Sequence, residues 1–420
     1  MTQHTKSPLT LHKGGRLSFR EFSGLPLAEK VQHIQGRPAK ERLDLIIADP
    51  EGQNIVREFP ALDLYLLVKE LGETDALELV QFASAEQFTF MLDLELWERW
   101  HFLPAKALLW LGYLLEGGEE PVVSFFRQAD PEFLTLIFME EITVGGGMGL
   151  LETDDDRLAT WDHSFDNIYY ITFNHAKHSE IVGRLLDVLY RRLHPLYTGL
   201  MESVKAETVA ELEELAFQFR SGRLADEGFP ELEHALELYM PVSPARYVAS
   251  GAKESSLVPV SGDFPVQFLT GDSLLRRTLG RCGSAELLTE LHYLINNVLV
   301  ADGADFTAAG AIEGLFQRVY GYLNIALEYL SSGDEEKAEE ILSGEPLREL
   351  FRLGFSLVVE LQRRWGKMKH NDYKLNKVLE GVRAARPRYY RGLDPDGVDA
   401  YREFQTFADV TKVAEVLGAA

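Results

Sequence analysis

The sequence contains very little cysteine, since Cys282 is the only one in 420 residues. A single thiol excludes a disulfide within the chain, and it excludes a zinc site built from several cysteines. This cysteine usage is typical of a reducing compartment, so we expect a cytoplasmic protein.

Long hydrophobic runs are also missing. The longest apolar run, residues 107–115, is far shorter than the roughly 20 residues that a membrane-spanning helix needs. The N-terminal sequence MTQHTKSPLTLHKGGRLSF lacks the apolar centre of a secretory signal peptide. We therefore expect no membrane insertion.

Basic residues are also scarce relative to acidic ones. The chain has 42 Lys and Arg residues against 66 Asp and Glu residues, which gives a formal net charge of −24. A chain this acidic repels the phosphate backbone of nucleic acids and the surface of anionic membranes. We therefore expect no nucleic-acid partner.

Apolar residues are plentiful, at 46% of the sequence, so the chain can bury a core and wholesale disorder is excluded. The length exceeds that of one ordinary domain and indicates two or three packed units.

A twelve-residue repeat organises residues 49–95. Steps of twelve bring similar residues into line, as in the two series Glu51, Asp63, Asp75, Gln87 and Ile55, Leu67, Leu79, Met91. One continuous helix would rotate the apolar stripe by about 120° at each step, so no common face would form. Pro60, Gly72 and Ser84 each open a unit and supply breaks. The pattern predicts a stack of short helices, with Leu67 and Leu79 buried at equivalent positions.

This arrangement of a turn, an acidic residue and an apolar triplet resembles the N-terminal superhelical domain of MgtE-type magnesium transporters. The resemblance covers the first third of the chain and implies a solenoid of short helices. The membrane domain of those transporters has no counterpart here, so ion transport is not implied. Over a greater length, the segments DLYLLVKELGETDALELV and GRLADEGFPELEHALELY resemble an uncharacterised bacterial family of unknown function.

The predicted fold is mainly α, with a short-helix repeat solenoid, a second helical bundle or hairpin unit, and a small β-hairpin insertion. The boundaries we expect are an N-terminal arm and cap (1–40), the superhelical repeat domain (41–143), the β insertion (144–175), the second helical domain (176–385) and a C-terminal tail (386–420). The insertion is placed by NIYYITF at 167–173, which is rich in β-branched and aromatic residues. We expect Tyr169–Phe173 to pair with the segment around Leu150 or Ala159.

A group of histidines and carboxylates surrounds this β segment, and its members are candidate metal ligands: Asp162, His163, Asp166, His175, His178 and Glu180. His175 and His178 could share one helical turn while carboxylates from the hairpin complete a metal sphere. The sequence contains no HExxH motif, and the alternative that we favour is a surface or hairpin-packing role.

Arg220 and Arg223 are two neighbouring cations in an acidic chain. They could bind an anion or a carboxylate of a partner, although an internal Arg–Asp bridge is the commoner arrangement. The acidic residues 154–156 could hold a divalent cation weakly, although a solvated hairpin tip is the interpretation that we favour.

No other motif indicates catalysis or a cofactor. Residues 145–147 are three glycines without the Lys-Ser/Thr of a phosphate-binding loop. The run from Asp394 to Asp399 has its glycine at the wrong position for a calcium loop.

We therefore expect a non-enzymatic scaffold or regulatory module that uses a groove of the solenoid to bind another protein. Two alternatives remain. One is a metal-dependent enzyme centred on His163, His175 and His178, and the other is a regulatory domain that responds to divalent cations.

Overall fold

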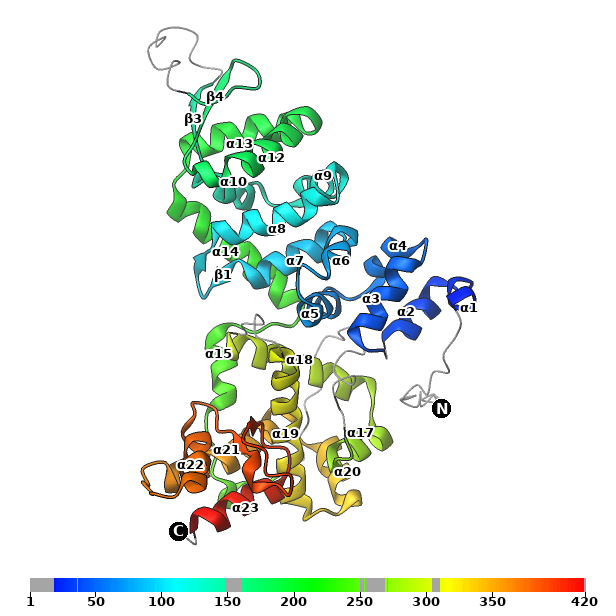
Figure 1. Ribbon diagram of the computed structural model, residues 1–420, viewed down its shortest axis with the longest axis vertical. Coiled ribbons are helices and arrows are strands. Elements are labelled where there is room, and N and C mark those ends of the chain that lie inside the picture. The colour runs from blue at the N-terminus through cyan, green and yellow to red at the C-terminus, as the bar shows by residue number, and fades with distance from the viewer. Residues whose placement is uncertain are drawn as a thin grey trace. The chain divides into compact units, whose positions relative to one another are not determined.

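The computed structural model describes residues 19–35, 37–147, 161–249, 253, 269, 271–303 and 310–418. The chain forms two compact units, Arg16–Asp226 and a second one that begins at Glu227, here called the solenoid unit and the C-terminal unit (Figure 1). Helices dominate both, and the strands of the described residues form two-stranded antiparallel pairs. The predicted mainly α fold is confirmed. No helix in the described ranges is long and apolar enough to cross a membrane.

The first part of the solenoid unit is a stack of short helices. They are α1 (Phe19–Ser23), α2 (Leu27–Gln35), α3 (Ala39–Ala48), α4 (Gly52–Glu58), α5 (Ala61–Leu71), α6 (Leu77–Phe82), α7 (Ala85–Glu95), α8 (Pro104–Glu116), α9 (Glu119–Gln128) and α10 (Pro131–Met139). Long and short helices alternate, since α5 and α7 have 11 residues whereas α4 has 7 and α6 has 6. Helix α5 packs on α3 and α7, and α6 packs on α4 and α8. The structural repeat is therefore a pair of helices, which spans two of the twelve-residue sequence units.

The three predicted breaks all coincide with helix ends. Pro60 is the N-cap residue of α5, and Gly72 ends α5 with a φ of 94°, a conformation that suits glycine. Ser84 caps α7 in a reciprocal capping box with Gln87. Leu67 and Leu79 are both fully buried, which confirms the twelve-residue alignment.

Gln87, at the polar position of the fourth repeat unit, joins α7 to α4. The side-chain amide of Gln87 donates to the carbonyl oxygens of Val56 at 2.9 Å and Phe59 at 2.7 Å, at the end of α4. Carbonyls at the end of a helix lack the full set of intrahelical partners, and that of Val56 otherwise accepts from the backbone nitrogen of Phe59 at 3.1 Å. One side chain thus begins α7 and completes the C-terminus of α4.

Two hairpins interrupt the solenoid. Strands β1 (Trp97–Glu98) and β2 (His101–Phe102) form a tight pair before α8. Strands β3 (Ile142–Gly146) and β4 (Tyr169–Phe173) form the second pair, with Ile142 opposite Phe173. The predicted strand is confirmed. We expected it to pair with the segment around Leu150 or Ala159, and among the described residues it pairs with the segment that leaves α10. Leu150, Ala159 and the acidic residues 154–156 lie outside the described residues.

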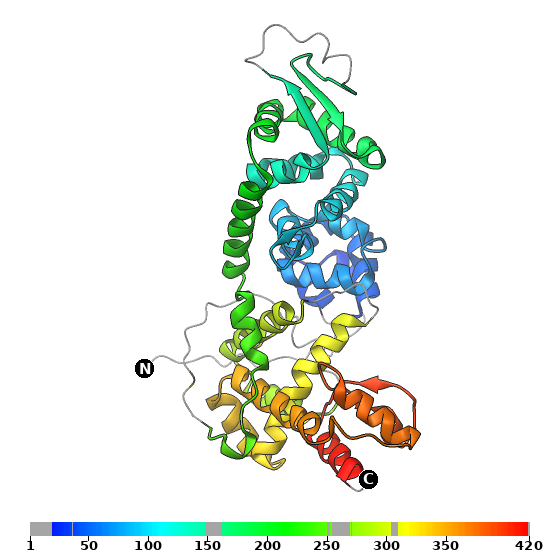
Figure 2. The ribbon, with the colours of Figure 1, turned by 90° about the vertical axis from the view of Figure 1, so that its left-hand side faces the viewer.

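The solenoid unit continues beyond the hairpin through η1 (Ala176–His178), α12 (Ser179–Arg192), α13 (His194–Ala206) and α14 (Val209–Asp226). Helix α12 packs on α8 and α9, and α13 and α14 pack on α10. Figure 2 shows α14 as a long helix beside the stack. The boundary between units therefore lies at Asp226/Glu227, whereas we expected a second domain to start at residue 176. The apolar faces of α12 and α14 are covered by α8–α10, and local sequence does not reveal that partner.

The C-terminal unit is a helical bundle with short additional elements. They are α15 (Leu232–Leu236), η2 (Glu237–Tyr239), η3 (Pro244–Arg246), α17 (Leu274–Cys282), α18 (Ala285–Asp302), α19 (Ala311–Ser331), α20 (Glu335–Gly344), α21 (Leu347–Trp365), α22 (Tyr373–Arg383), β5 (Tyr389–Tyr390), η4 (Arg391–Leu393), β6 (Tyr401–Arg402) and α23 (Phe407–Gly418). Helix α19 is central and contacts α17, α18, α20, α21 and α23.

The segment that we predicted as a C-terminal tail, 386–420, is part of this core as far as the structure describes it, to residue 418. Glu403 is buried and accepts from Arg318 of α19 at 2.9 Å, while Arg318 also pairs with Asp302 of α18. A Cβ atom on Gly321 would lie only 1.9 Å from the carbonyl oxygen of Phe404, so α19 admits the C-terminal segment only because residue 321 is glycine.

Leu79→Ala is expected to destabilise the solenoid unit by about 2–5 kcal/mol, because it leaves a cavity at a fully buried repeat position. Urea unfolding followed by circular dichroism measures the change. Leu109→Ala, at an exposed leucine of the same unit, is the matched control and is expected to change little. Equal effects of the two substitutions would contradict the burial of the repeat stripe.

Candidate functional site

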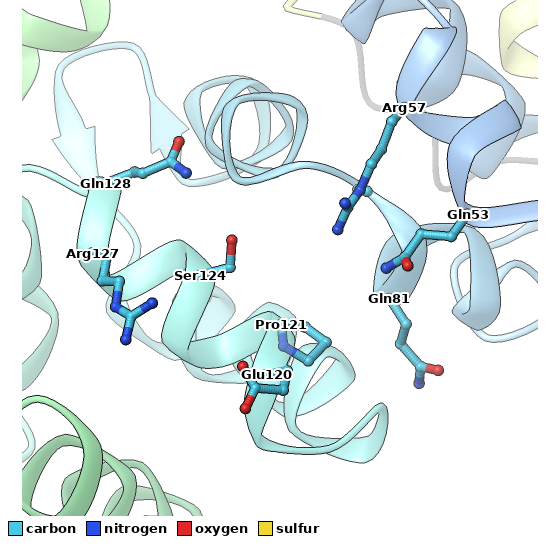
Figure 3. Close-up of a pocket in the computed structure, with 9 residues that line it drawn as sticks. Gln53, Arg57, Gln81, Glu120, Pro121, Ser124, Arg127 and Gln128 are labelled. Atoms are coloured by element: carbon cyan, nitrogen blue, oxygen red, sulfur yellow. The ribbon is translucent and has the colours of Figure 1, made fainter.

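The solenoid unit contains a pocket of about 410 Å³ between α4, α6 and α9 (Figure 3). Its lining is mainly polar and consists of Gln53, Arg57, Gln81, Ala83, Glu120, Pro121, Ser124, Arg127 and Gln128. Arg57 reaches into the space between α4 and α9, and Ser124 lies between Arg57 and Arg127 in the view of Figure 3. All of these residues belong to one unit of the protein.

The repeat explains how the polar side chains reach the pocket. Gln53 and Arg57 are four residues apart on α4, so they share one face of that helix. Arg57 and Gln81 occupy the same repeat position two units apart, on short helices that pack together. On α9, Ser124, Arg127 and Gln128 follow the spacing of a helix face. The apolar face of α9, including Val122 and Phe126, is buried in the stack.

Two guanidinium groups give the pocket its positive charge. The Nε atom of Arg57 donates to the carbonyl oxygen of Phe82 at 3.4 Å. In the part of the chain that the structure describes, no carboxylate forms an ion pair with Arg57 or Arg127. The lining carboxylate, Glu120, is already paired with Arg192 at 2.6 Å. The pocket is therefore a locally cationic site in an acidic protein.

The remaining groups suit hydrogen bonding to a polypeptide. Gln53, Gln81 and Gln128 offer amide donors and acceptors. The side-chain nitrogen of Gln81 donates to the carbonyl oxygen of Tyr113 at 3.3 Å, which holds the side chain in place. Ser124 has no histidine beside it in the lining, so the pocket lacks the pair of nucleophile and base that acyl transfer requires. The arrangement fits binding of a ligand.

The structure uses the histidines for packing and hydrogen bonding. His163 pairs through its backbone with Ile171, and its ring packs edge-on against Phe165 with 4.3 Å between centroids. The Nδ1 atom of His178 lies 2.8 Å from Oε2 of the buried Glu141. His175 is exposed, and its ring centroid is 5.7 Å from that of His178.

The carboxylates of the candidate group serve the hairpin. Asp162 accepts from the backbone nitrogen of Phe173 at 2.9 Å. Asp166 accepts from the backbone nitrogens of Ile168 and Tyr169. Glu180 is exposed in the first turn of α12. Among the described residues, no group of three or more His, Cys, Asp or Glu side chains is arranged to hold a metal ion.

Arg223 forms an internal Arg–Asp bridge, the commoner of the two arrangements considered for it. Its guanidinium binds both carboxylate oxygens of the buried Asp93 at 2.7 Å and Asp130 at 2.5 Å. Burial opposes the charge of Arg223, but the hydrogen bonds and charges of Asp93 and Asp130 outweigh it and raise its pKa. The guanidinium of Arg223 is therefore already occupied by two carboxylates of the same chain. Arg220 donates through Nε to the carbonyl oxygen of Asp93 at 2.6 Å.

Sequence reasoning missed Arg57 and Arg127. The signal available in the sequence was the basic residue Arg57 within the first repeat unit. The fold of α9 beside α4 and α6, which makes Arg127 its neighbour, was not visible in the sequence.

Fold and pocket together define a mainly α protein with a helical solenoid, a polar, cationic pocket and a second helical unit. The chain belongs to DUF6178, a family of unknown function that matches residues 20–420. The expected membership of an uncharacterised family is thus confirmed. Comparisons with curated proteins and with solved structures found no match.

Arg223→Ala is expected to destabilise the solenoid unit by about 3–5 kcal/mol, because Asp93 would remain buried without a cation. Thermal and urea unfolding measure the loss. Arg191→Ala removes an arginine that also binds two carboxylates, Glu119 and Asp187, but does so at the surface. That control is expected to unfold almost like the wild type, and an equally mild effect of Arg223→Ala would contradict the assigned role.

Proposed function

We propose that the solenoid unit is a protein-interaction module that binds an acidic, extended segment of a partner protein in the pocket between α4, α6 and α9. The observation that carries this proposal is the pair Arg57 and Arg127, which line one pocket without an ion-pairing carboxylate among the described residues. Guanidinium groups bind carboxylates through paired hydrogen bonds, and they do so best where no other anion competes.

The shape of the unit supports an extended ligand. Stacked short helices present side chains at regular intervals, so a chain crossing α4, α6 and α9 meets successive polar groups. Glutamine side chains can donate to backbone carbonyls and accept from backbone amides of an extended segment. The absence of a nucleophile and base pair in the lining favours binding over catalysis.

The proposal also covers the compartment and the partners of the module. We propose that the module acts in the cytoplasm, without a cofactor and without a nucleic-acid partner, consistent with the net charge of −24. The alternation of long and short helices also supports a superhelical architecture of the MgtE N-terminal type. The negative charge of the rest of the chain would repel acidic segments that do not reach the pocket, which gives selectivity.

The test is the binding of a short fluorescein-labelled peptide of alternating Glu and Gly, measured by fluorescence anisotropy with the full chain. Arg57→Glu combined with Arg127→Glu is expected to raise the Kd at least about tenfold, or about 1.4 kcal/mol. Binding by the wild type is expected to weaken with added salt, because the pocket is open to solvent.

Arg184→Glu is the matched control. Arg184 is an exposed arginine of the same unit that lies outside the pocket lining, so its reversal changes the net charge by the same amount per residue. It is expected to leave the Kd nearly unchanged. An equal loss per reversed charge in both variants, or equal binding of a peptide with Gln in place of Glu, would refute the pocket as the site.

Metal analysis and melting temperatures test the two alternatives that involve metal ions. Protein purified without chelator is expected to contain no stoichiometric zinc, iron or manganese, and Mg²⁺ or Ca²⁺ is expected not to shift its melting temperature. A stoichiometric metal that is lost in the variant His175→Ala/His178→Ala would support the metal-dependent enzyme instead. A cation-dependent melting temperature would support the regulatory domain that responds to divalent cations.

A further inference from the structure

Another arginine without an ion-pairing carboxylate among the described residues, Arg220, lies elsewhere in the solenoid unit, beside the β1–β2 hairpin. Arg220 of α14 uses its Nε–H to donate to the carbonyl oxygen of Asp93. Its two terminal amino groups have no acceptor in the described portion of the chain. Arg223, one turn further along the same helix, has carboxylates on both of its sides. The two arginines therefore share Asp93 unequally, and Arg220 receives only a backbone carbonyl.

Aromatic rings hold the guanidinium of Arg220 in place. Its central carbon lies 5.6 Å from the centre of the Trp97 ring and 5.7 Å from that of Phe217. Trp97 is further packed by Phe102, with 5.4 Å between centroids. A cation that faces aromatic rings interacts through the flat side of the guanidinium. The N–H groups on its edge remain available for an acceptor.

Trp97 supplies an independent second observation. The residue is only 8% exposed, and its buried Nε1 atom has no hydrogen-bond partner among the described residues. A buried indole N–H normally finds an acceptor, since leaving it unpaired costs free energy. The indole N–H of Trp97 and the terminal amino groups of Arg220 are thus neighbouring donors without an acceptor among the described residues.

The electrostatic state of Arg220 agrees with this geometry. Burial above all, opposed by the charge of Asp93 and assisted by that of Arg223, lowers the pKa of Arg220 to about 10. A lowered pKa in a base means that its charged form is less stable in the folded protein than in water. An anion beside the guanidinium would restore that stability.

We propose that Arg220 and Trp97 form a binding site for a carboxylate group, supplied by an acidic side chain or the C-terminus of a bound polypeptide. The planar edge of the guanidinium matches the two oxygens of a carboxylate. A doubly charged phosphate fits less well, because Asp93, Asp130 and Glu213 lie on the surrounding elements. Glu213 itself is held by the backbone nitrogen of Phe102 at 2.8 Å.

The site does not depend on the α4–α6–α9 pocket. Its residues come from α14 and the β1–β2 hairpin, and none of them lines that pocket. Arg220→Gln is therefore expected to leave the binding of the Glu-Gly peptide by Arg57 and Arg127 intact. Failure of either proposal can thus be recognised separately.

The experiment uses the full chain labelled with ¹⁵N and ²H, and it follows the indole N–H signal of Trp97. Trp97→Phe assigns this signal by removing it. Sodium acetate is titrated at constant ionic strength, with sodium chloride making up the balance. The expected result is a saturating shift of the Trp97 signal with acetate that is absent with chloride alone and absent in Arg220→Gln. Arg184→Gln, the control at an exposed arginine, is expected to retain the shift.

A shift that does not saturate, or one that persists in Arg220→Gln, would overturn the proposal. If Arg220→Gln fails to fold, Arg220→Lys replaces it, because lysine keeps the positive charge and the aliphatic stem but has no planar fork. The affinity for acetate is then expected to fall at least about tenfold. Unchanged affinity in a folded Arg220→Lys variant would equally contradict a carboxylate site.

Discussion

Arg223 connects three helices of the solenoid unit through buried or half-buried charge. Its guanidinium, on α14, binds Asp93 of α7 and Asp130 at the start of α10. These partners are 130 and 93 residues away in the sequence. Because a buried carboxylate without its cation is costly, this bridge favours the observed placement of α14 on the stack. Helix α9, which forms one wall of the pocket, packs on α7, α8 and α12. It is therefore connected to the bridge through α7.

Similar charge pairs recur along the stack. Lys30, which is 1% exposed, binds Asp49 at 3.0 Å and Glu51 at 2.8 Å. Lys69 binds Glu73 and Glu95. Burial alone would lower the pKa of Lys30, but the hydrogen bonds and charges of Glu51 and Asp49 more than compensate and raise it. We interpret these ion pairs as contacts that select one packing register between neighbouring helices, since short apolar helices by themselves can stack in several registers.

Arginines such as Arg223 already bind carboxylates of the same chain. Arginines without such a partner are therefore the candidates for binding a ligand. Arg57 and Arg127 line a polar pocket, and Arg220 faces aromatic rings, all without a carboxylate partner among the described residues. In a chain with a net charge of −24, an unneutralised cation is a local departure from the overall field. This is why we assign both proposed sites to acidic ligands.

The sequence by itself determined the local structure of the repeat. Pro60, Gly72 and Ser84 end or begin helices for reasons contained in their own backbones and side chains, and the spacing of Leu67 and Leu79 defines the buried face. The β-branched and aromatic residues of Tyr169–Phe173 determined a strand. Only the tertiary structure decided which segment that strand pairs with, that α12–α14 belong to the solenoid unit, and that the C-terminal segment enters the core beside Gly321. It also decided which arginines are already paired, because an ion pair such as Arg223–Asp93 joins residues that only the folded chain brings together.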